Sequence, residues 1–166
     1  MTPESTLTET VRFTAAHAGL QAEDAASAPW LVTGAVLMAQ QAAAIALRAA
    51  GDSIPAQAGA TELLLRAASR DRLPAPFTLP FGAAVRQSFD RLVEARNTFM
   101  HPRGMVWHVS QDTLARGLPV TTRIVRHLIL TQPVLNDLVS PDQQEQIREG
   151  LSVIDAWAEF SGELRQ

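Results

Sequence analysis

Three polar residues with chemically useful side chains lie close together in the middle of this 166-residue chain. They are Arg96, Asn97 and His101, in the stretch RNTFMH, and Pro102 follows directly. An arginine can stabilise charge that develops on a phosphate, and a histidine can accept or donate a proton near neutral pH. RNA carries its own nucleophile, the ribose 2′-hydroxyl. Such a set could therefore cleave RNA without a metal ion or a protein nucleophile, with Asn97 orienting either His101 or the phosphate.

The element that must position these residues is a helix that we expect over about 81–99. At about 100° per residue its apolar side chains form one stripe, and Arg96 falls inside that stripe. A guanidinium on the core-facing side is costly unless it has a carboxylate partner, extends to solvent or lines a cleft. The sequence leaves these three explanations open. The stripe consists of Phe81, Val85, Phe89, Leu92 and Phe99, and the opposite side carries Arg86, Asp90 and Glu94.

Pro102 determines where this helix ends, because a residue that precedes proline is pushed out of the α region. We therefore expect the last helical residue to be about Met100. In a continuous helix, positions 96 and 101 would point about 140° apart, too far to share a site. A break at His101 lets its imidazole fold back towards Arg96. His101 could instead only favour the negative end of the helix dipole.

Charge is distributed unevenly along the chain. The net charge is −3, but residues 63–127 carry ten Arg against four acidic residues, and both flanking segments are acidic. The chain contains no Lys, which suits bidentate phosphate binding but would also follow from a GC-rich genome. Within this basic block, Arg91 and Arg103 are candidates for RNA binding around the motif. Their alternative role is that of ordinary solvated helix charges.

Composition excludes several classes of site. The chain is 46% hydrophobic and has no Cys, so it can bury a core but cannot form disulfides, thiolate metal sites or a Cys nucleophile. No His-Glu-x-x-His pair, Walker A loop or dinucleotide fingerprint is present. We therefore expect neither a metal nor a cofactor. We also expect a cytoplasmic protein, because no secretory signal is visible.

The pattern predicts an all-α protein that forms one domain over residues 1–166. The uncharged segment 25–47 contains Pro29, Gly34 and two Gln, which favours a buried central helix over a membrane span. Capping-box spacing occurs at Thr6 with Glu9 and at Ser140 with Gln143. The prolines in 71–80 predict a linker there. We expect 105–109 to be a short extended segment and 133–139 to be a turn or short helix. Helices are expected over about 4–19, 30–50, 61–70, 81–99, 119–131 and 141–161.

The stretch RLVEARNTFMHP, residues 91–102, resembles the signature of HEPN domains, in which Arg and a polar residue precede a His. The resemblance implies an antiparallel bundle of about five to seven helices that dimerises through the motif face. In many members it implies a metal-independent endoribonuclease, with Arg96, Asn97 and His101 as catalytic residues. It also implies toxin–antitoxin or phage-defence roles in bacteria and an antitoxin partner. A subgroup carries a modifiable Tyr two residues after the His, where this chain has Arg103.

Two alternatives remain at this point. Some HEPN-like proteins are non-catalytic modules that bind RNA, a nucleotide or a protein, and they would keep Arg96 and His101 as fold elements. The motif is also short enough to occur by chance in a helical structural protein.

Overall fold

The computed structural model describes residues 2–20, 24–101, 108–131 and 138–163, and these ranges contain helices and no strand. The predicted all-α class is therefore confirmed. A 3-10 turn, η1 (Ala25–Ser27), precedes the second helix, and a π-helical segment, η2 (Arg126–Leu130), continues the fifth. The α-helices are α1 (Pro3–Leu20), α2 (Ala28–Ala49), α3 (Ala60–Ala67), α4 (Ala83–Met100), α5 (Gln111–Val125) and α6 (Pro141–Glu163).

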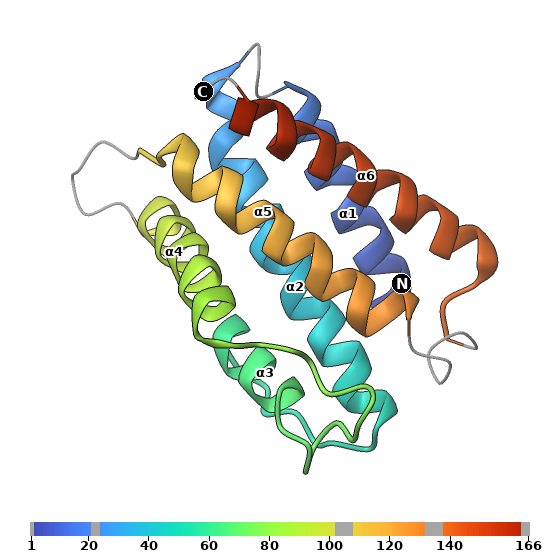
Figure 1. The fold of residues 1–166 in the computed structure, drawn as a ribbon. Coiled ribbons are helices and arrows are strands. Elements are labelled where there is room, and N and C mark those ends of the chain that lie inside the picture. The colour runs from blue at the N-terminus through green and yellow to red at the C-terminus, as the bar shows by residue number, and fades with distance from the viewer. Residues whose placement is uncertain (1, 21–23, 102–107, 132–137, 164–166) are drawn as a thin grey trace.

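The bundle is built around α2 (Figure 1). This helix contacts α1, α3, α4 and α5, while α6 packs on α1 and α5. Helix α5 crosses over α2, with α4 and α3 on one side and α1 and α6 on the other. The described helices share one buried apolar core.

The uncharged segment 25–47 forms most of α2, and this helix lies at the centre of the bundle, as predicted. By length and composition it passes the test for a membrane span, which the core helix of a soluble protein passes as well. Of the most apolar 18-residue stretch of this helix, 67% is buried inside the bundle. Alanine and glycine dominate its contacts, and these small residues allow neighbouring helices to approach closely.

Glycines lie where helices approach most closely, and two of them concern α2 and α4. A Cβ atom built on Gly34 of α2 would lie 2.2 Å from Oγ1 of Thr14 in α1. A Cβ on Gly117 of α5 would lie 2.4 Å from Cγ of Leu92 in α4. Because Leu92 is fully buried, it cannot move aside freely. Gly117 therefore fixes how closely α4, the helix of the Arg-Asn-His motif, packs against α5.

The helix caps were predicted in part. At the start of α6 the Ser140 amide donates to Oε1 of Gln143 at 3.0 Å, and the Gln143 amide donates to Oγ of Ser140 at 3.3 Å, which confirms the capping box. The proposed box at Thr6 and Glu9 is wrong. Helix α1 starts earlier, where the amides of Thr2 and Ser5 donate to each other's hydroxyls, and the Thr6 hydroxyl donates to the Thr2 carbonyl at 2.9 Å.

Helix α2 ends as the glycine after it predicts. Gly51 has a φ of +82°, the left-handed conformation that glycine adopts most readily. The Asp52 amide then donates to the Leu47 carbonyl at 2.9 Å, and the Gly51 amide donates to the Arg48 carbonyl at 2.9 Å. These two bonds form a Schellman cap.

Helix α3 is shorter than predicted, because it ends at Ala67 instead of about residue 70. A turn over 68–73 follows, and both Arg66 and Arg72 reach the carboxylate of Asp52. In a continuous helix these two arginines would point about 120° apart. The turn allows both to bind the same carboxylate, and residues 71–80 are non-helical as expected.

Helix α5 begins eight residues before the predicted start at 119. The N-cap is Ser110, whose hydroxyl accepts from the Thr113 amide at 3.1 Å. Pro119 therefore lies inside the helix, between the buried residues Leu118 and Val120. The free energy gained by burying these two side chains outweighs the cost of a proline inside a helix. Most of the predicted extended segment 105–109 and turn 133–139 lie outside the described residues.

We predict that Gly117→Ala destabilises the protein even though alanine is the better helix former. The added methyl group would overlap Leu92, and we expect a loss of about 1–3 kcal/mol in the free energy of unfolding. Gly19→Ala in α1 is the matched control, because no atom lies within 4 Å of its Cβ position. Urea denaturation measures both. Equal stability of the two variants would contradict a close α4–α5 contact at Gly117.

Candidate functional site

The apolar stripe predicted for α4 faces the bundle. Phe89 and Leu92 are fully buried, whereas Arg86 and Glu94 on the other side are exposed. Arg96, one turn beyond Leu92, is partly buried. Arg96 was predicted to lie inside the apolar stripe, and in the structure it is only partly buried.

An aromatic contact attaches the end of α4 to α2. The rings of Phe99 and Trp30 lie 5.4 Å apart at an interplanar angle of 79°, an edge-to-face geometry. Arg96 precedes Phe99 by three residues, so the two side chains lie on the same side of α4. The contact therefore holds the Arg96 end of α4 beside the first turns of α2.

The guanidinium of Arg96 has an unusual partner. Its Nη2 donates to Oδ1 of Asn97 at 2.8 Å, and its Nε donates to the same oxygen at 3.2 Å. Among the described residues no carboxylate forms an ion pair with Arg96. Burial lowers the pKa of the Arg96 guanidinium, because the charged form is partly desolvated. The group still carries its charge at neutral pH, so it is a cation without an anion.

His101 stands where α4 ends. Its φ of −128° and ψ of 68° lie outside the helical region, as the proline after it predicts, and its amide donates to the Asn97 carbonyl at 3.0 Å. The residue is exposed. Within the described part of the chain, its imidazole makes no hydrogen bond with Arg96. The predicted helix break is confirmed, and the two side chains share one helix end without a hydrogen bond between them in the described residues.

Of the two candidate RNA-binding arginines, Arg91 lies within the described residues. Arg91 is exposed and lines an open hollow of about 670 Å³ on the outer face of α4, together with Arg86, Asp90 and Glu94. Positions 91 and 96 point about 140° apart, so Arg91 does not face the same direction as Arg96. Arg103 lies outside the described residues, and its role stays a prediction.

The basic block is less basic than its composition suggests. Arg86 and Arg116 pair with carboxylates one turn away, and Arg126 pairs with Asp155 of α6. Arg66 and Arg72 both bind Asp52. Of the described arginines in 63–127, those without an ion pair in the described ranges are Arg70, Arg91, Arg96 and Arg123.

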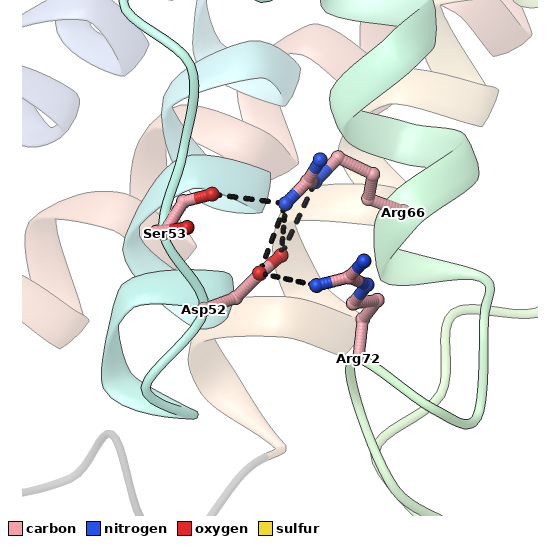
Figure 2. Close-up of polar contacts among 4 residues, drawn as sticks. All are labelled: Asp52, Ser53, Arg66 and Arg72. Carbon is pink, nitrogen blue, oxygen red and sulfur yellow. Dashed lines mark hydrogen bonds and ion pairs between the residues drawn. The ribbon is translucent and has the colours of Figure 1, made fainter.

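The Asp52 cluster is structural (Figure 2). Its carboxylate is 6% exposed and receives Nη2 of Arg66 at 2.8 Å and Nη1 of Arg72 at 3.0 Å. Arg66 also donates to the Ser53 carbonyl at 2.9 Å. Burial alone raises the pKa of Asp52, but the bonds and charges of Arg66 and Arg72 outweigh it, so the pKa lies below its ordinary value. The cluster joins the end of α2 to α3.

An apolar groove on the outer side of α1 and α2 was not predicted from the sequence. It encloses about 340 Å³, and its largest side chains are Phe13, Trp30 and Leu37, exposed by 43%, 46% and 39%. Through Trp30 the groove adjoins Phe99, and the next residue, Met100, is 53% exposed. The spacing of Trp30 and Leu37, seven residues apart, was the available signal. It was hidden because nearly all of α2 is apolar.

Comparison of the chain with protein-family models, curated proteins and solved structures finds no match. In the described residues, no group of three or more His, Asp or Glu side chains could hold a metal ion. The resemblance to HEPN domains therefore rests on the motif and its helical setting.

We predict that Asp52→Asn lowers the melting temperature at pH 7, because Arg66 and Arg72 lose their shared anion. Since the folded-state pKa of Asp52 is lowered, its contribution is complete above the unfolded pKa of about 4 and is lost as pH falls through the lowered value. The difference from wild type should therefore be constant between about pH 7 and 5 and shrink below about pH 4.

Thermal melts over this pH range measure the effect. Glu9→Gln is the control, because Glu9 belongs to an exposed pair with Arg12 whose side chains are about 60% exposed. A difference that is absent at pH 7, or that does not shrink in acid, would contradict the structural role of Asp52.

Proposed function

We propose that the protein is a dimeric HEPN-type endoribonuclease that cleaves RNA without a metal ion. The observation that carries the proposal is Arg96, a partly buried guanidinium whose only hydrogen-bond partner in the described residues is the neutral Asn97. A cation in such a position is suited to an anion supplied from outside. The exposed His101 at the same helix end can transfer protons at that anion.

The reaction would use the 2′-hydroxyl of RNA as nucleophile. A base removes the 2′-hydroxyl proton, the 2′-oxygen attacks phosphorus, and the bond to the 5′-oxygen breaks as an acid donates a proton to it. The products are a 2′,3′-cyclic phosphate and a free 5′-hydroxyl. Arg96 would stabilise the charge on the phosphorane oxygens, and Asn97 would release Arg96 or bind the phosphate through its amide.

One imidazole cannot act as base and acid in the same step, which favours a dimer. The equivalent His101 of a second copy would supply the other proton transfer if the two motifs face each other. The apolar groove with Phe13, Trp30 and Leu37 adjoins the motif, and exposed apolar groups of this kind mark interaction surfaces. The resemblance to HEPN domains further leads us to propose that the protein acts in the cytoplasm as a toxin or in phage defence, with an antitoxin as its partner.

A second function is favoured by the Arg96–Asn97 hydrogen bonds themselves. Nη2 and Nε of Arg96 donate to Oδ1 of Asn97 within the same chain, at 2.8 and 3.2 Å. This is what a non-catalytic module would need if it kept the motif as a fold element. Such a module would bind RNA, a nucleotide or a protein without cleaving it.

We predict that purified protein cleaves structured RNA in the presence of EDTA, and that His101→Ala and Arg96→Gln each reduce the rate by at least about 100-fold. Arg86→Gln is the matched control, because this arginine of the same helix is exposed, is paired with Asp90 and points about 80° away from Arg96. Gel analysis of cleavage and of the cyclic phosphate end measures the result. A 2′-O-methyl substrate should remain intact.

Several results would contradict the nuclease. Equal cleavage by wild type and His101→Ala would indicate a contaminating enzyme, and loss of cleavage in EDTA would exclude the metal-free mechanism. RNA binding without cleavage by folded wild-type protein would establish the non-catalytic module instead.

A further inference from the structure

We infer a second ligand site, for a small carboxylate with an apolar tail, in a cavity between the 79–80 segment, α4 and α5. The cavity has a volume of about 270 Å³. It contains two polar side chains, Arg123 and His127, which lie one turn apart on the same helical stretch. Its apolar wall is formed by Leu79, Pro80, Val85, Val120 and Ile124.

Arg123 supplies the positive charge. Its Nε donates to the Pro119 carbonyl at 3.1 Å, which fixes the guanidinium stem against α5. No carboxylate in the described part of the chain pairs with Arg123, so its two Nη groups remain for a ligand. Two parallel N–H donors match the geometry of a carboxylate.

His127 supplies a second, fixed polar group. Its Nε2 lies 3.1 Å from the Phe77 carbonyl oxygen. A carbonyl can only accept, so Nε2 carries the hydrogen and the ring orientation is set. Nδ1 is then the ring nitrogen that remains for a ligand or a ligand-bound water.

The backbone at this point is irregular, which is an independent indication of a site. Residues Arg126–Leu130 form a π-helix, and the Thr131 amide donates to the Arg126 carbonyl, five residues back, at 3.1 Å. Single π turns are rare and occur frequently at functional sites. Here the π turn contains His127 itself.

The size and polarity of the cavity select the ligand. At about 30 Å³ per water, the volume corresponds to about nine waters, so a ligand of about eight to ten non-hydrogen atoms would fill it. The apolar wall suits a hydrocarbon chain or ring, and Arg123 suits one carboxylate. The site is distinct from the Arg-Asn-His motif, because Val85 and Arg96 are about 16 Å apart along α4.

The test is calorimetric titration of the full chain with sodium hexanoate and with hexanamide, its neutral counterpart. We expect hexanoate to bind, with hexanamide and the Arg123→Gln variant at least about tenfold weaker. Arg116→Gln is the matched control on the same helix, and it should bind as wild type does, because Arg116 is exposed and outside the cavity.

The cavity itself is tested by Val85→Phe, which should abolish binding by filling the space. Arg123 is exposed, so Arg123→Gln tests the proposal even if Val85→Phe fails to fold. Absence of hexanoate binding to wild type at millimolar concentration would overturn the proposal. Equal binding of hexanoate and hexanamide, or equal binding by Arg123→Gln, would overturn it as well.

Discussion

The close packing of small residues around α2 is the constraint on which the rest of the structure depends. Gly34 leaves no room for a side chain between α2 and α1, and Gly117 does the same between α5 and α4. Because α4 is held by α2 on one side and by α5 on the other, its orientation is fixed. The Trp30–Phe99 contact then holds the C-terminal end of α4, which carries Arg96 and His101, against α2.

Much of this could be predicted from the sequence where one local rule acts alone. The stripe of α4, the break at His101 and the cap at Ser140 follow from periodicity, proline sterics and side-chain hydrogen bonding. Prediction was wrong where a distant contact decided. Helix α3 ends early at a turn that brings Arg66 and Arg72 to the carboxylate of Asp52, and the burial of Leu118 and Val120 retains Pro119 inside α5.

The candidate site shows the same difference between local features, which the sequence reveals, and distant contacts, which it does not. Sequence identified the Arg96–His101 helix end, but it could not show that Arg66, Arg72 and Arg126 pair with carboxylates while Arg96 has no such partner among the described residues. Most of the described arginines in 63–127 form ion pairs with carboxylates, so few arginines of this block remain without an ion pair in the described residues. Two of these, Arg96 and Arg123, lie against apolar surfaces at different places in the bundle.

The central claim is that Arg96 binds the phosphate of RNA. The most direct measurement is the affinity of wild type and Arg96→Gln for a fluorescent 2′-O-methyl RNA, which cannot be cleaved, by anisotropy at several salt concentrations. We expect Arg96→Gln to bind more weakly. The slope of log affinity against log salt concentration should be smaller by about one for each Arg96 that contacts a phosphate. Equal affinity and equal slope for the two proteins would contradict it.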